Sequence, residues 1–214
     1  MPLNWDLSSL ADAMDLAIQS IEAELQLEQA VYGLDARSEL QLQALLAAQL
    51  SKSYEVAREV HYPSSFGAKL THRRRCDMVL SPRGRPLKLD RAPATLFDAP
   101  DLCPPENALW LEVKVAYQFR EGGVRHAGYG QQWRGAVVSD LVKMEGESAI
   151  HEAALVLIVF NESKDVLEKD LGLFEDVLMR KEVLAGFRHV RSVGIWERMG
   201  HRWCSVAVWP TIQR

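Results

Sequence analysis

The chain has 214 residues, of which 48% are hydrophobic and 25% are charged, and these values are typical of a globular protein with one core of ordinary size. It has no run of about 18 apolar residues and no Lys or Arg near its start, so we expect neither a membrane span nor a secretory signal. Three widely spaced cysteines favour neither a disulfide framework nor a zinc site, and a cytoplasmic location is the simplest expectation.

Charge is unevenly distributed along the chain. Residues 1–35 hold seven acids and no Lys or Arg, whereas the rest of the chain has 22 acids against 25 Lys and Arg. A body with a net charge of +3 is compatible with nucleic-acid binding. The acids by themselves are more typical of a helix with one solvated face.

The first half of the chain predicts two helices and two strands. Apolar residues three and four apart predict a helix over 6–31, ended by Gly33. Ser38 and Gln41 form a capping-box pattern at the start of a second helix, and Glu39 lies in its first turn, where the helix dipole favours an acid. A strand is expected over 54–61, and a shorter one over 76–80 follows a loop at 62–67.

The second half begins with a long loop over 81–107, which holds six of the nine prolines and one short predicted strand around 87–89. A central strand over 108–116, a glycine-rich crossing, a helix over 129–145 and a buried strand over 153–160 follow. Asp165 is the predicted cap of a further helix that Gly186 ends, and a hairpin over 193–209 completes the chain. This order predicts an α/β domain with a mixed central sheet flanked by helices.

The central strand carries the most informative pattern. Side chains alternate along a strand, so Glu112 and Lys114 share one face, while Leu111, Val113 and Val115 share the other. Two charges in an apolar strand cost free energy unless something compensates them. A simple ion pair, or a strand edge where both charges reach water, is the alternative to a functional pair.

Basic residues gather at two further places. Arg73, Arg74 and Arg75 precede the strand that begins with Cys76 and Asp77, and arginine makes bidentate bonds to phosphate. The alternative is a solvated segment in which Arg75 pairs with an acid. The helix over 129–145 offers polar candidates for contact with a nucleic-acid backbone, namely Gln131, Arg134 and Lys143. Trp133 is expected in the core, and Asp140 with Lys143 is also typical of a surface pair on one helix.

Asp77 and Glu112-Val113-Lys114, on neighbouring strands after a helix that bears Glu39, resemble the PD-(D/E)xK nuclease superfamily, which has the restriction-endonuclease-like fold. The resemblance covers about residues 38–160 and includes the order helix, strand, strand, strand, helix, strand. Cys76 stands where the superfamily often has proline. The Gln-Tyr spacing of its exonuclease-like members is absent, so that subgroup is not supported.

The resemblance implies a site for Mg²⁺, with Mn²⁺ as an alternative, because hard cations prefer carboxylate oxygens and water. Its metal ligands would be Asp77, Glu112 and the backbone carbonyl of Val113. Lys114 would position or deprotonate the attacking water and offset charge at the phosphate. Glu39 would act as an outer ligand through water.

We therefore expect a metal-dependent deoxyribonuclease, an endonuclease by preference, that acts on DNA in defence, restriction, repair or mobile-element processing. Two-strand cutting is commonly arranged with twofold symmetry, which favours a homodimer. The same expectation includes partner proteins of a defence or mobile-element system. The nuclease-like domain would span residues 36–214, with residues 1–35 as an appended acidic helix.

Two alternatives remain open from the residues alone. The chain could be a non-catalytic module that binds nucleic acid or assembles with other proteins while keeping the nuclease-like fold. Its acidic first helix could also be an autoinhibitory cover that occupies the DNA channel. The first alternative does not require stabilisation by Mg²⁺, whereas a catalytic protein does, and the second alternative predicts higher activity once residues 1–35 are removed.

Overall fold

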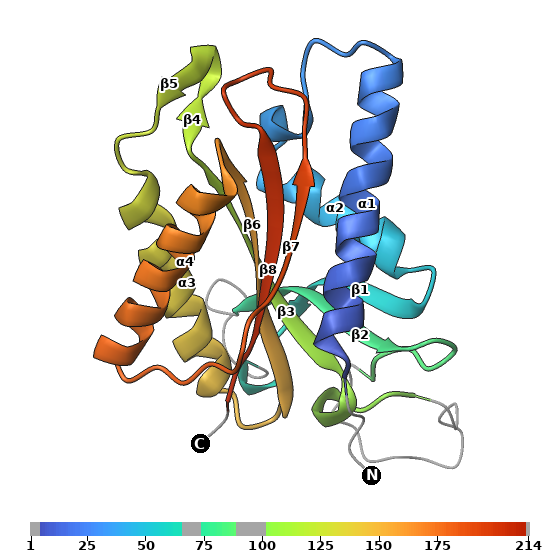
Figure 1. Cartoon of the computed structure of the whole chain (residues 1–214). Coiled ribbons are helices and arrows are strands. Elements are labelled where there is room, and N and C mark those ends of the chain that lie inside the picture. Colours follow the sequence, from blue (N-terminus) through green and yellow to red (C-terminus); the bar gives the residue numbers. More distant parts are fainter. Residues whose placement is uncertain (1–4, 66–73, 89–101, 213–214) are drawn as a thin grey trace.

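The computed structural model describes residues 5–65, 74–88 and 102–212 (Figure 1). Its main sheet has six strands in the order β1-β2-β3-β6-β8-β7. Their bounds are β1 (Tyr54–His61), β2 (Arg75–Pro82), β3 (Leu109–Tyr117), β6 (Glu152–Asn161), β7 (His189–Gly194) and β8 (Trp203–Pro210). The pair β3 and β6 is parallel, and the other neighbouring pairs are antiparallel. The prediction of a mixed central sheet is therefore confirmed.

The described residues form four α-helices that sandwich this sheet, namely α1 (Leu7–Leu27), α2 (Glu39–Leu50), α3 (Tyr129–Glu145) and α4 (Lys164–Arg180). Figure 1 shows α1 and α2 on one face and α3 and α4 on the other. Each face has its own hydrophobic cluster because apolar side chains alternate along the strands. The clusters meet in β6, which is buried on both faces, as its run of apolar residues predicted.

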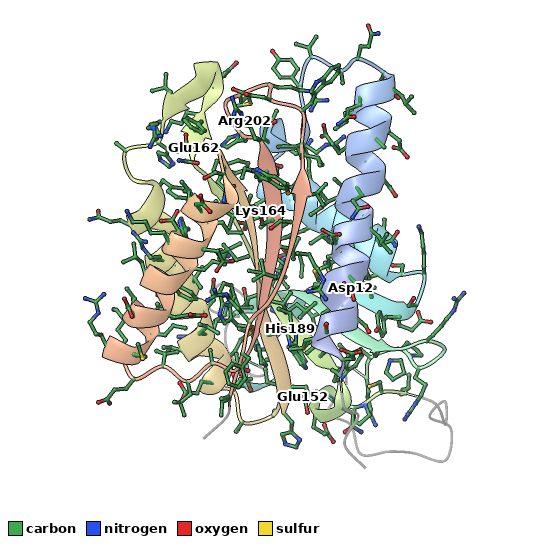
Figure 2. All side chains as sticks on the ribbon, in the orientation of Figure 1. Asp12, Glu152, Glu162, Lys164, His189 and Arg202 are labelled. Carbon is green, nitrogen blue, oxygen red and sulfur yellow. The ribbon has the colours of Figure 1, made fainter. Side chains whose placement is uncertain are left out.

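Helix α1 is an integral layer of the fold. Its apolar stripe, which includes Leu10 and Met14, belongs to the same cluster as α2 and the inner strands. On its polar side Asp12, labelled in Figure 2, places Oδ1 2.5 Å from Nε of Arg191 in β7. Near its end Glu22 is buried with Arg198, whose guanidinium lies 3.0 Å from Oε1. The acidic helix thus packs on the face opposite α3.

Local signals placed several element boundaries correctly, but α1 ends at Leu27, before the predicted stop at Gly33. Ser38 caps α2 and makes the predicted capping box with Gln41. The predicted cap at Asp165 is wrong, because Ser163 accepts the amide of Val166 and α4 begins at Lys164. The same helix ends at Arg180, before the predicted stop at Gly186, since the chain turns there towards β7.

Two stretches that lack strong periodicity contain structure. The glycine-rich crossing forms a small hairpin of β4 (Phe119–Arg120) and β5 (Val124–Arg125), with Gly122 and Gly123 at positive φ in the turn. In the proline-rich loop Leu87 forms an isolated bridge with Cys103, and Leu89 lies outside the described residues. None of the helices within the described ranges has the length and hydrophobicity needed to cross a membrane.

Candidate catalytic site

The two faces of β3 differ as its sequence predicted. Leu111 and Val113 lie in the cluster shared with α1 and α2. Glu112 and Lys114 project to the other face, towards α3. Glu112 is only 2% exposed, so its charge must be compensated inside the protein.

The sheet opens beside this face. Strand β3 pairs with β6 over nine residues but with β2 over only three, from Met78 opposite Leu111 to Leu80 opposite Leu109. Asp77 immediately precedes Met78 in β2 and lies where the two strands separate. Its Oδ2 accepts a hydrogen bond from the backbone amide of Val113, at 2.8 Å. This bond takes the place of the one that a paired β2 residue would have made to the same amide.

Cys76 precedes Asp77, at the position where the resemblance led us to expect a proline. Its thiol lies 3.2 Å from the carbonyl oxygen of Leu111 and 3.4 Å from that of Met78. The side chain is buried between the two strands and joins β2 to β3 just before they part. A proline ring could not donate such a bond.

A chain of alternating charges connects the catalytic candidates. Nζ of Lys114 lies 3.7 Å from Oε1 of Glu39 and 3.4 Å from Oδ2 of Asp140. The other oxygen of Asp140 lies 3.1 Å from Nζ of Lys143, which in turn lies 2.5 Å from Oε1 of Glu112. Helix α2, strand β3 and helix α3 thus converge on one network.

Glu112 is held by two donors on the same oxygen. The hydroxyl of Tyr62 donates to Oε1 at 2.6 Å, beside the ammonium of Lys143. The Tyr62 ring also lies 5.4 Å from that ammonium and stacks on Trp110. These contacts fix the carboxylate, and they make Tyr62 and Lys143 supports of the site.

Electrostatics set the protonation of the network. Burial raises the pKa of Glu112 to about 7, and the bonds from Lys143 and Tyr62 offset only part of the effect. Burial also raises the pKa of Glu39, which Lys114 partly lowers. Burial lowers the pKa of Lys114, but the carboxylates of Asp140 and Glu39 more than compensate and leave that pKa raised. Lys114 is therefore an ammonium at neutral pH.

The raised pKa of Glu112 predicts a pH dependence of stability. The folded protein keeps a proton on Glu112 up to pH of about 7, while the unfolded chain releases it near pH of about 4.3. The folded state therefore loses stability as the pH rises through this window. Relative to Glu112→Gln, which does not titrate, the wild type should lose about 3 kcal/mol between pH values of about 4 and 8.

Urea unfolding of both proteins at several pH values, in EDTA, measures this difference. Glu24→Gln is the matched control, because Glu24 is exposed on α1 and its substitution should leave the pH profile unchanged. A constant difference in the free energy of unfolding between wild type and Glu112→Gln across this range would contradict the prediction.

The basic candidates lie in different places. Arg73 is outside the described residues, and Arg75 is exposed with NH1 3.9 Å from Glu59. Arg74 is exposed and lines a pocket of about 770 Å³ together with Lys143 and Lys181. Gln131 is exposed on α3.

Arg134 does not join this group. Its guanidinium lies over the ring of Trp133 and 3.9 Å from Asp170 of α4, so it contributes to the contact between α3 and α4. Trp133 is buried, as predicted. Lys143, predicted as a nucleic-acid contact, holds the carboxylate of Glu112.

Sequence reasoning missed two members of the site. The sequence predicts a surface pair of Asp140 and Lys143, but Asp140 also contacts Lys114 and so bridges the two lysines. Tyr62 falls in a predicted loop, yet its hydroxyl donates to Glu112. The spacing of Asp140 and Lys143, one helical turn apart, indicates that these two side chains meet. No local pattern indicates a contact for Tyr62.

Whether a divalent cation fits can be judged from donors and charge. Among the described residues, no group of three or more His, Cys, Asp or Glu side chains is already arranged to hold a metal ion. The oxygens of Asp77, Glu112 and the Val113 carbonyl are the donors that Mg²⁺ prefers. With Asp77 added to the three acids of the network, the site holds four carboxylates and two ammonium groups. When all are ionised, the carboxylates are in excess by two charges, which a divalent cation would neutralise.

Comparison with family models, curated proteins and solved structures finds no match to this chain. The functional argument therefore rests on the geometry and charge of the site.

Proposed function

We propose that this protein is a metal-dependent deoxyribonuclease of the restriction-endonuclease-like class, with its centre at Asp77, Glu112 and Lys114. The observation that supports the proposal most is the convergence of these residues with Glu39 where β2 and β3 separate. The element order α2-β1-β2-β3-α3-β6, with β6 parallel to β3, is also the order that the resemblance implies. A simple surface ion pair would not bring three buried or half-buried acids and two lysines into one network.

The protein's own residues would divide the work of phosphodiester hydrolysis. Water attacks phosphorus, the bond from phosphorus to one sugar oxygen breaks, and that oxygen receives a proton. Lys114, as an ammonium, would bind a phosphate oxygen and offset the charge that develops there. Glu39 and Asp140 hold its side chain in place from two helices.

Asp77, Glu112 and the Val113 carbonyl would hold Mg²⁺ or Mn²⁺, which when bound polarises the phosphate and acidifies a water. Lys143 now contacts the Glu112 oxygen, so the ammonium and the cation would compete for this carboxylate. Asp77 is oriented by the Val113 amide, which leaves its second oxygen for a further contact.

The test is cleavage of supercoiled plasmid with Mg²⁺, Mn²⁺ or EDTA, beside the thermal midpoint of the same samples. We expect nicking with either metal and none in EDTA. A cation that binds the folded state raises the midpoint by mass action, and Asp77→Asn should lose both this increase and the nicking. Asp176→Asn, at an exposed site on α4, is the control.

Two outcomes would count against the proposal. Nicking that persists in EDTA would show that cleavage does not depend on a metal. The absence of cleavage and of any metal-induced stabilisation in the wild type would favour the non-catalytic module. The proposal also includes DNA as the substrate, a homodimer, and partner proteins of a defence or mobile-element system. These would be tested after cleavage is established.

A further inference from the structure

A small pocket of about 250 Å³ lies directly beside Lys114. It occupies the opening between the start of α2 and the first half of α3, along the part of β3 that has no β2 partner. Nine residues line it: Glu39, Lys114, Val115, Ala116, Tyr117, His126, Tyr129, Trp133 and Ala136. Whatever enters this pocket therefore lies next to the proposed catalytic lysine.

Aromatic rings dominate its walls and are held in place by packing. Tyr117 stacks on Phe160 with ring centroids 5.2 Å apart and planes 2° from parallel. On α3 the ring centroids of Tyr129 and Trp133 are 6.1 Å apart, and Trp133 also packs on Phe174. Such a pocket is preformed, so a flat ring could enter without rearranging the core.

The size of the pocket limits what it can hold. Sites for drug-sized ligands commonly have volumes of ≈ 300–1,000 Å³, so a pocket of about 250 Å³ is suited to one ring system. Aromatic walls with a lysine at one end offer stacking for a base and a positive charge for the adjoining phosphate. Each nucleotide presents this combination of chemistry.

The pocket also continues into a larger one. Tyr117 and His126 line both it and a second pocket of about 790 Å³ at the β4 hairpin. Arg37 and Arg120 line that second pocket together with Asp35 and Glu121, so the two guanidinium groups there could contact phosphates beside two acids. On the other side of Lys114, its partner Asp140 lines the 770 Å³ pocket together with Lys143 and Arg74. A single strand could follow this path past the catalytic centre.

We propose that the 250 Å³ pocket binds one unpaired base of single-stranded DNA and thereby places the adjoining phosphodiester at Lys114. This inference rests on the proposed nuclease function and adds its substrate class. A base inside a duplex is stacked and paired, so it cannot enter unless it is extruded at the cost of a few kcal/mol. The site accordingly favours single strands, strand ends or distorted duplexes.

Ala136→Phe tests the pocket, because Ala136 is exposed on α3 and a phenyl group there would fill the space without disturbing the core. The probe is a ten-nucleotide single strand with 2-aminopurine at its centre, titrated with protein in EDTA so that no cleavage is needed. We expect the fluorescence to be quenched on binding, as stacking on aromatic rings requires. Affinity should fall roughly 10- to 100-fold in Ala136→Phe, the range that loss of one stacked base implies.

Ala48→Phe is the matched control, since Ala48 is an exposed alanine on α2 that lines none of these pockets. Its affinity should equal that of the wild type, and a duplex of the same sequence should bind the wild type more weakly. Equal affinity of Ala136→Phe and wild type, unquenched fluorescence in the complex, or no binding at all would overturn the inference.

The two proposals fail separately. Quenching that is lost in Ala136→Phe, in a protein that cleaves nothing, would keep the base pocket and reject the nuclease. Metal-dependent plasmid cleavage with unchanged binding in Ala136→Phe would keep the nuclease and reject the base pocket.

Discussion

Substituting Lys114→Ala should reduce metal-dependent cleavage about 100- to 1,000-fold or more, the usual loss when one donor that stabilises transition-state charge is removed. The reason is that the Lys114 ammonium contacts both Glu39 and Asp140, which hold it as a cation where β2 and β3 separate. The initial rate of plasmid nicking with Mg²⁺ measures the effect. Circular dichroism would verify that the variant is folded.

Lys169→Ala provides the control for this experiment, because Lys169 is exposed on α4 and remote from the network. It should cleave at the wild-type rate. If Lys114→Ala nicked plasmid within about threefold of the wild type, the assignment of this lysine to the catalytic centre would be wrong.

The second large effect concerns stability. Leu10 of α1 is 1% exposed and lies in the core cluster, whereas Leu16 of the same helix is 54% exposed. Leu10→Ala removes buried methyl groups and leaves a cavity, so it should lower the free energy of unfolding by about 2–5 kcal/mol. The same change at Leu16 should alter it by no more than about 0.5 kcal/mol. Urea unfolding of both variants measures the difference.

This prediction bears on the hypothesis that the acidic helix is an autoinhibitory cover. A removable cover would leave a stable body, but α1 supplies a layer of the core on the face opposite α3. Deletion of residues 1–35 should therefore give unfolded or aggregated protein and no activated nuclease. Equal stability of the Leu10→Ala and Leu16→Ala variants, or a folded and more active truncation, would show that α1 is dispensable.

Much of the fold could be predicted because its signals are local. Three- and four-residue spacing defined α1, the capping box defined the start of α2, and the unbroken apolar run defined β6 as doubly buried. The predicted cap of α4 was wrong because Ser163 and Asp165, two positions apart, are both good capping residues. Only the direction in which the chain leaves β6 decides between them.

The candidate site divides in the same way. The alternation along β3 is a property of any strand, so the sequence by itself determined that Glu112 and Lys114 share a face. Which groups meet that face depends on residues far apart in the chain. Tyr62 lies 50 residues from Glu112, and their hydrogen bond exists because β1 and β3 both flank β2.

Tertiary structure alone decided three features that matter most for function. These are the separation of β2 from β3 at Asp77, the alternating chain from Glu39 to Glu112, and the aromatic pocket beside Lys114. Each arises where α2, β3 and α3 converge. Local sequence patterns fix the period and the ends of an element, whereas charge compensation and cavities depend on what packing brings together, and no short-range pattern records that.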